Sequence, residues 1–152
     1  MAVPANDMPL EGRFEGREHR FPLRVYFEDT DLSGVVYHAN YLRYMERARS
    51  AMLRAAGIDQ RAAFDAGEGA YAIRDLAIRY LGPSRLDDTL DVLTRVVRVR
   101  AASVDIQQRV MRGAVVLTEA RVEAAFVAPN GRPRRQPASW VAVIEALVWQ
   151  GD

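Results

Sequence analysis

Residues 26–41, YFEDTDLSGVVYHANY, join two segments whose apolar side chains repeat with different periods. In the segment before them, Leu23, Val25 and Phe27 alternate with polar neighbours. This alternation predicts a strand, because successive side chains of a strand point to opposite faces. In the segment after them, apolar residues recur at helical spacing until Gly57, a natural helix stop. The sequence therefore predicts a strand that delivers an acidic turn to the start of a long helix.

This junction brings together two complementary kinds of chemical group. The first turn of a helix has backbone N–H groups without intrahelical partners and carries a partial positive charge. The acidic turn supplies carboxylates that can act as a base or a nucleophile. The junction is therefore the first candidate for a catalytic site.

The composition limits the class of protein. The chain has 152 residues, enough for one domain with a core of its own. The absence of cysteine excludes thiol catalysis, thiolate zinc sites and disulfide frameworks, and it fits a reducing compartment. With 21 basic and 20 acidic residues, a net charge of +1, no global field favours nucleic acid or an anionic membrane as a partner.

The first twenty residues differ in character from the rest of the chain. They have mixed charge and include Pro4, Gly12 and Gly16, and they lack the apolar centre of a secretory signal. We therefore expect a mobile N-terminal tail over residues 1–20, a single domain over residues 21–149, and a cytoplasmic location.

Strands and turns dominate the chain beyond the long helix. A short helical segment is expected over residues 58–66 and a closing helix over residues 139–147. Between them, alternating apolar residues and turn signals predict four strands, over residues 71–80, 90–100, 104–110 and 114–127. Because no crossover helix separates these strands, the residues favour an α+β fold with one antiparallel sheet.

Four short motifs resemble the signature of the hotdog-fold acyl-CoA thioesterases of the 4-hydroxybenzoyl-CoA thioesterase type. They are residues 26–31 (YFEDTD), 34–38 (GVVYH), 40–41 (NY) and 46–49 (ERAR). The branch associated with the bacterial Tol-Pal envelope system is the most similar. The resemblance implies a long central helix wrapped by an antiparallel sheet of about five strands. It also implies subunits paired edge to edge, as a homodimer or a dimer of dimers (a homotetramer), with active sites at the subunit interface.

The same resemblance implies an enzyme and its partners. The expected reaction is hydrolysis of acyl-CoA or acyl-carrier-protein thioesters, with a short-chain aliphatic or aromatic acyl group and without a cofactor. The branch also implies a peripheral link to the inner membrane through an envelope complex.

Asp31 matches the catalytic aspartate of this family. The thiol released from a thioester has a pKa of roughly 8 to 9, by analogy with cysteine, so it leaves with little help from a general acid. One carboxylate can therefore suffice, either by attacking the carbonyl carbon or by activating a water molecule. Judged by spacing alone, Asp31 would instead accept turn hydrogen bonds beside Ser33 and Gly34. Asp29 is assigned to a structural hydrogen bond.

The resemblance assigns substrate contacts to five further positions. The backbone N–H of His38 matches the group that polarises the thioester carbonyl at the positive helix end. The His38 ring is a second candidate for this role, and its alternative is to pack beside Tyr37 with a neighbouring group as its partner. Tyr37 and Tyr41 are candidates for lining the acyl pocket, although aromatic side chains at such positions also fit a plain core. Arg98 and Arg100 precede a turn, as a clamp for the CoA phosphates requires, but Ala101 and Ala102 replace the family's denser basic cluster.

Glu46 is the rival catalytic base, because related hotdog enzymes of another branch use a carboxylate on the helix. The alternative for Glu46 is an ion pair with Arg43, Arg47 or Arg49, which lie three or one residues away on the same helix.

Three other functions compete with the thioesterase. A hotdog dehydratase usually needs a histidine paired with a carboxylate, and only His38 is available. A metal hydrolase would take Asp29, Asp31 and His38 as ligands, but the other histidine, His19, falls in the expected tail, so no metal is expected. A non-catalytic acyl-ligand or envelope-complex binding module on the same fold also stays open.

Overall fold

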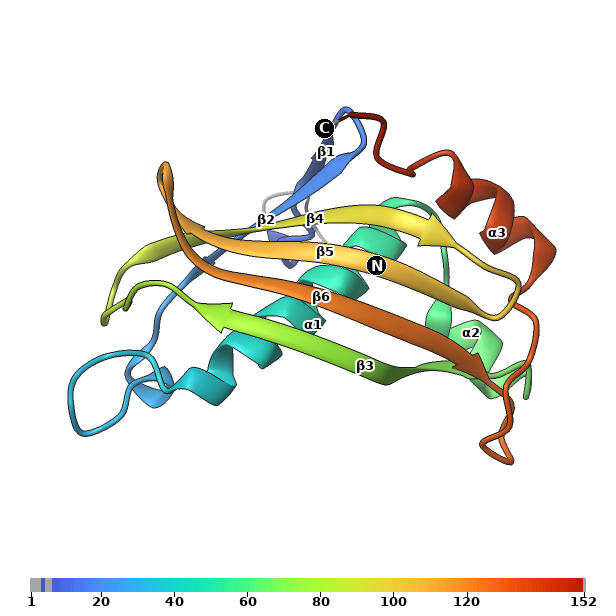
Figure 1. The fold of residues 1–152 in the computed structure, drawn as a ribbon, viewed down its shortest axis with the longest axis horizontal. Helices are drawn as coiled ribbons and strands as arrows, with labels where there is room; N and C mark the ends of the chain where they lie inside the picture. The colour runs from blue at the N-terminus through green and yellow to red at the C-terminus, as the bar shows by residue number, and fades with distance from the viewer. Residues whose placement is uncertain (1–3, 5–6, 152) are drawn as a thin grey trace.

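The chain folds into one antiparallel sheet that wraps a long helix (Figure 1). The structure is a computed structural model and describes residue 4 and residues 7–151. The sheet has six strands in the order β1-β2-β4-β5-β6-β3, and every neighbouring pair is antiparallel. The elements in chain order are β1 (Arg13–Glu15), β2 (Glu18–Arg24), the 3₁₀ turn η2 (Phe27–Asp29), α1 (His38–Ala55), α2 (Gln60–Asp65), β3 (Ala70–Tyr80), β4 (Thr89–Val99), β5 (Ser103–Arg112), β6 (Val115–Val127) and α3 (Ala138–Glu145). The expected α+β architecture is confirmed, with one strand more than expected.

Helix α1 is buried along the stripe that its sequence periodicity predicts. Tyr44, Met45 and Ala48 are at most 1% exposed, and they face apolar side chains from the inner side of β4, β5 and β6. Burying each large apolar side chain contributes about 1.5–3 kcal/mol, so this stripe holds the helix against the sheet. The helix ends at Ala55, just before Gly57, which adopts a φ of +87° that favours glycine.

The N-terminal end of the domain differs from the sequence prediction. Residues 13–15 and 18–20, which were assigned to the tail, form β1 and the start of β2. Gly12 permits this hairpin to close, because a Cβ on its backbone would lie 2.0 Å from the carbonyl oxygen of Arg20. Glu11 then forms an ion pair with Arg54 of α1, 2.9 Å apart. The three residues of β1 are too few to give a periodic pattern, so this strand could not be predicted from the sequence.

The strand predicted from the alternation of Leu23, Val25 and Phe27 is wrong beyond Arg24, where β2 ends. Residues 27–29 form η2 instead, because the carboxylate of Asp29 accepts a hydrogen bond from the backbone N–H of Tyr26 at 2.8 Å. Asp29 and Asp31 therefore do not project from one face of a strand.

The start of α1 is fixed against the end of β3 and the connection that follows it. The hydroxyl of Tyr80, the last residue of β3, donates to the carbonyl oxygen of His38 at 3.0 Å. The N–H of Val36 donates to the carbonyl oxygen of Ser84, in the connection from β3 to β4, at 2.8 Å. The acidic turn and the helix start thus lie together at one end of the sheet.

Candidate active site

A closed loop carries the acidic turn and the first residue of the helix. Thr30 and Val36 form an antiparallel bridge, so the two sides of the loop run alongside each other. The N–H of Asp31 donates to the carbonyl oxygen of Val35, and the N–H of Tyr37 donates to that of Asp29, both at 2.9 Å. These bonds place Asp31 and the helix start on one short, hydrogen-bonded loop.

Asn40 holds this loop from the helix side. Its side-chain amide donates to the carbonyl oxygen of Asp29 at 2.8 Å and accepts from Arg43 at 3.1 Å. Asn40 therefore lies in the first turn of α1 and ties that turn to η2, rather than capping the helix.

The carboxylate of Asp31 is exposed and has one of its oxygens occupied. Oδ1 accepts hydrogen bonds from the backbone N–H of Ser33 at 2.8 Å and from the Ser33 hydroxyl at 2.5 Å. These bonds favour the ionised form, and the Ser33 hydroxyl is the largest cause of a pKa for Asp31 below its ordinary value. Asp31 therefore presents an ionised carboxylate whose Oδ2 receives no bond from the described residues.

The start of α1 offers free hydrogen-bond donors beside this loop. The helix begins at His38, and no side chain caps it. Within the described part of the chain, the N–H groups of His38 and Ala39 have no acceptor, and the helix dipole adds positive potential there. The ring of His38 lies against Tyr37 and Tyr80, with ring centroids 4.5 and 5.9 Å away. The sequence prediction that the helix begins at His38 is confirmed.

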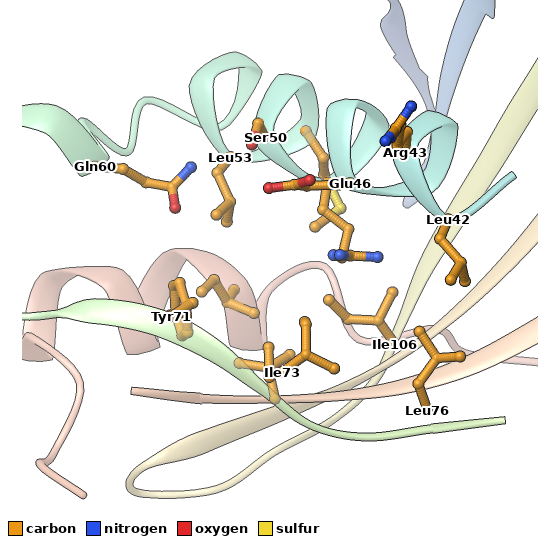
Figure 2. A pocket seen from close by; sticks show the side chains of 15 residues that line it. Leu42, Arg43, Glu46, Ser50, Leu53, Gln60, Tyr71, Ile73, Leu76 and Ile106 are labelled. Carbon is orange, nitrogen blue, oxygen red and sulfur yellow. The ribbon is translucent and has the colours of Figure 1, made fainter. Parts of the chain in front are cut away.

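A cavity of about 380 Å³ lies between α1 and the strands β3, β5 and β6 (Figure 2). Its wall is mainly apolar and includes Leu42, Leu53, Ile73, Leu76, Ile106 and Ile144. Leu42 lies one helical turn beyond His38, so the cavity begins close to the helix start and continues along α1. A cavity of this shape suits an elongated or flat apolar group.

Three charged side chains of α1, Arg43, Glu46 and Arg49, line the cavity. Figure 2 shows Arg43 and Glu46 on the helix. The guanidinium of Arg49 donates to the side-chain oxygen of Gln108 at 2.8 Å. Burial lowers the pKa of Arg49, and the nearby charge of Glu46 opposes that shift. Among the described residues Glu46 forms no ion pair, so the expected pairing with a helix arginine is absent there.

The two tyrosines predicted for the acyl pocket do not line this cavity. Tyr41 is 3% exposed, and its hydroxyl lies 2.6 Å from that of Ser84 in the core. Tyr37 is exposed and lies against His38. Sequence reasoning missed the polar contact at Arg49, because its partner Gln108 is 59 residues away and only the fold brings them together.

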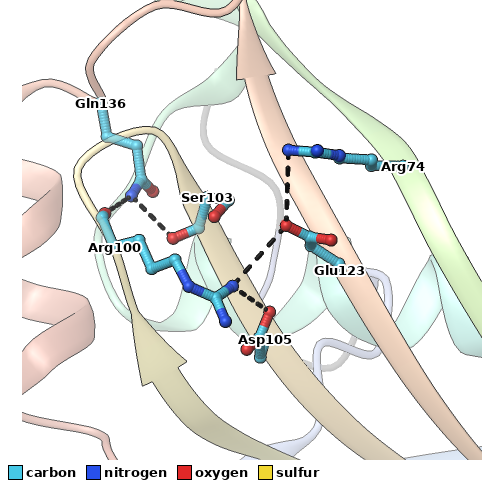
Figure 3. Close-up of polar contacts among 6 residues, drawn as sticks. All are labelled: Arg74, Arg100, Ser103, Asp105, Glu123 and Gln136. Carbon is cyan, nitrogen blue, oxygen red and sulfur yellow. Dashed lines mark hydrogen bonds and ion pairs between the residues drawn. The ribbon is translucent and has the colours of Figure 1, made fainter.

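The two arginines predicted for the CoA phosphates lie far from Asp31 in the same chain. They lie near the turn between β4 and β5, at the end of the sheet opposite the helix start (Figure 1). β4, which leads to that turn, is 11 residues long and spans roughly 35 Å at about 3.3 Å per residue. Arg100 pairs with Asp105 at 2.9 Å and with Glu123 at 3.6 Å (Figure 3). Arg98 is exposed and forms no ion pair with the described residues.

The described residues contain neither a metal-binding cluster nor a helix that could span a membrane. Across residues 7–151 and residue 4, no three histidine, cysteine or acidic side chains gather as a metal-binding group. Over the same residues, no helix has both the length and the apolar character needed to cross a membrane.

Comparisons with known proteins agree with the architecture. The family model of the thioesterase-like superfamily matches residues 25–146. The chain is 44% identical over 107 residues to the acyl-CoA thioesterase YbgC of Haemophilus influenzae, covering 70% of this chain and 79% of that protein. It is 42% identical over 125 residues to the acyl-CoA thioester hydrolase YbgC of Escherichia coli, covering 81% and 92%.

A solved structure gives the same result. The crystal structure of a probable thioesterase from Bartonella henselae superimposes with a TM-score of 0.76 at 38% identity, over 79% of this chain and 99% of that one. The hotdog fold expected from the sequence is confirmed. The chain belongs to the thioesterase-like superfamily.

Proposed function

We propose that this protein hydrolyses the thioester bond of acyl-CoA, with Asp31 as the reacting carboxylate and the N–H of His38 as the group that polarises the carbonyl. Family membership and the two relatives above, both named as thioester-cleaving enzymes, make the protein a thioester hydrolase. The observation that carries the assignment of the site is the closed loop, which joins an ionised, exposed carboxylate to an uncapped helix start.

The chemistry requires little beyond these groups. Oδ2 of Asp31 either attacks the carbonyl carbon or removes a proton from a water molecule that attacks it. In both cases negative charge develops on the carbonyl oxygen, and the N–H groups at the start of α1 stabilise that charge. Direct attack expels the CoA thiolate and leaves a mixed anhydride, which water then cleaves to release the acid.

We assign the acyl group to the cavity along α1. Its volume of about 380 Å³ and its apolar wall fit a short-chain aliphatic or an aromatic acyl group. The carboxylate of Glu46 lies at this cavity rather than at the acidic turn, which supports Asp31 as the reacting group.

We further propose that two copies of the chain complete the site. β3 is an edge strand of 11 residues, and pairing it with β3 of a second copy would continue the sheet. In such an antiparallel dimer the far end of one sheet approaches the helix start of the other. Arg98 and Arg100 of the partner then serve as contacts of the CoA phosphates. A dimer of dimers, a cytoplasmic location and a link to the Tol-Pal complex remain predictions from the resemblance.

Thiol release from a panel of acyl-CoAs tests the activity. The panel contains short aliphatic, long aliphatic and aromatic acyl groups. The native protein is compared with Leu76→Trp, a variant that narrows the cavity near its Leu42 end (Figure 2). We expect the native protein to cleave at least one short or aromatic substrate, and Leu76→Trp to lose the bulkier acyl groups first. If the native protein releases no thiol from any acyl-CoA but cleaves an acyl-carrier protein, the CoA assignment is wrong. If it cleaves neither while still binding them, the binding-module alternative is favoured.

A further inference from the structure

Ser33 makes two contacts with one oxygen of Asp31. Its backbone N–H and its hydroxyl both donate to Oδ1, at 2.8 and 2.5 Å. The N–H of Gly34 closes the turn by donating to the carbonyl oxygen of Asp31 at 3.0 Å, and Gly34 has the φ of +85° that this tight turn needs. The hydroxyl is therefore held by a hydrogen-bonded turn rather than by a flexible contact.

Two donors on a single oxygen make the two ends of the carboxylate unequal. A carboxylate with one donor can rotate and exchange its oxygens, whereas two convergent donors hold Oδ1 in place. Oδ2 is then the oxygen that keeps its lone pairs for chemistry. Because a reacting group misplaced by about 1 Å can cost roughly a hundredfold in rate, this fixed orientation has a direct catalytic value.

We propose that Ser33 is a positioning residue whose hydroxyl fixes the rotation of the Asp31 carboxylate, so that Oδ2 faces the thioester. This role rests on the proposed function. In this role the Ser33 side chain fixes the orientation of the carboxylate, which the backbone N–H of the turn alone does not do.

The hydroxyl also affects the acid form of the site. Both Ser33 bonds favour the ionised carboxylate, so removing the hydroxyl moves the pKa of Asp31 upward toward its ordinary value. Hydrogen bonds and slight desolvation account for the pKa of Asp31, and no charged neighbour contributes. Of the nearby charges, Asp29 is directed to the N–H of Tyr26, and Glu28 and Arg85 are exposed. The backbone N–H of Val35 also lowers this pKa, so the contribution of the Ser33 hydroxyl is the difference between the acid limbs of the native protein and of a variant without that hydroxyl.

Three variants separate this role from a general effect on the loop. Ser33→Ala removes the hydroxyl but keeps the backbone donor, and Ser33→Thr restores a hydroxyl. Thr30→Val is the matched control, because the Thr30 hydroxyl belongs to the same loop but donates to the carbonyl oxygen of Phe27 at 3.0 Å.

Two readouts are needed for each variant. Carbon-13 NMR follows the titration of labelled aspartate carboxyls, with Asp31 assigned by the resonance that Asp31→Asn removes. Thiol release from the best acyl-CoA gives kcat and KM as a function of pH. For Ser33→Ala we expect an upward shift of the Asp31 titration and of the acid limb, a fall in kcat of about tenfold and a KM within about twofold, since Ser33 does not touch substrate. Ser33→Thr restores kcat and Thr30→Val matches the native protein.

The outcomes distinguish the two proposals. If the native protein is active and Ser33→Ala keeps its kcat and its acid limb, the positioning role is overturned while the thioesterase assignment stands. If Ser33→Ala shifts the carboxyl titration but not kcat, the contact exists without the catalytic role, which also overturns the inference. If the native protein is inactive on every thioester, the proposed function fails first, and the NMR titration shows whether the contact itself forms.

Discussion

Gln108 explains how a charged arginine can lie between the helix and the sheet. Its side chain is completely buried and makes three hydrogen bonds. The amide group donates to the carbonyl oxygen of Met45 at 2.9 Å and to the hydroxyl of Thr94 at 3.0 Å, and its oxygen accepts from Arg49 at 2.8 Å. A buried polar group costs little when its partners are satisfied, so this residue makes the charged part of the cavity tolerable.

Gln108→Leu is expected to destabilise the protein strongly, although the two side chains have similar volumes. The change leaves the Met45 carbonyl, the Thr94 hydroxyl and the Arg49 guanidinium without this partner, which we expect to cost about 2–4 kcal/mol in the free energy of unfolding. Gln107→Leu is the matched control on the other face of β5, with an expected change below about 0.5 kcal/mol. Urea unfolding measures both. Equal midpoints for the two variants would contradict the role given to Gln108.

At the scale of elements, the unpaired edge of β3 needs an explanation. Among the described residues β3 is paired only with β6, and Ile73 of β3, which lines the cavity, is 45% exposed. Natural sheets usually protect long edges with proline, bulges or charges, and β3 has a bulge and charged residues at Arg74 and Asp75 but no proline. The remaining edge is long enough to pair with a second copy.

Ile73→Lys is expected to weaken that pairing. It places a positive charge beside the seam in both copies, so the measured mass in light scattering should fall toward that of a single chain. Val115→Lys is the control, because Val115 is 54% exposed but lies at the start of β6, after the β5–β6 turn. A native protein that is already a single chain at micromolar concentration would contradict edge pairing through β3.

The elements show where sequence reasoning succeeds. The long strands and α1 carry enough apolar periods to be predicted, and β4 at Thr89–Val99 differs by one residue from the expected 90–100. β2 and η2 were misjudged because local hydrogen bonds between residues 26 and 30, among them the one from the Tyr26 N–H to the Asp29 carboxylate, override an alternating pattern. The spacing of apolar residues in the sequence does not indicate such a contact.

In the candidate site, too, some features could be predicted from the sequence and others could not. Asp31 and His38 lie in two adjacent motifs, so the sequence places them together, and one closed loop joins them in the fold. The pairing of Arg49 with Gln108 depends on packing a helix against a distant strand, which short-range patterns cannot specify. The separation of Arg98 and Arg100 from Asp31 is likewise a consequence of strand length and direction.

At the scale of the whole molecule, the wrapped helix has two functions. Its buried side chains form the helix side of the core, and its first turn supplies the donors that face the acidic loop. The same helix then forms one wall of the cavity. One element thus connects the stability of the fold, the proposed carbonyl site and the proposed acyl site.

The most direct test of the account is the rate of thiol release by Asp31→Asn compared with Glu46→Gln. Both variants remove one negative charge at nearly constant size, and urea midpoints close to that of the native protein would show that both are folded. We expect Asp31→Asn to lose at least about a thousandfold in kcat, because an amide is neither a nucleophile nor a base. Glu46→Gln should stay within about tenfold of the native kcat. Native-like turnover by Asp31→Asn, or loss of turnover in Glu46→Gln alone, would contradict the assignment of Asp31 as the reacting carboxylate.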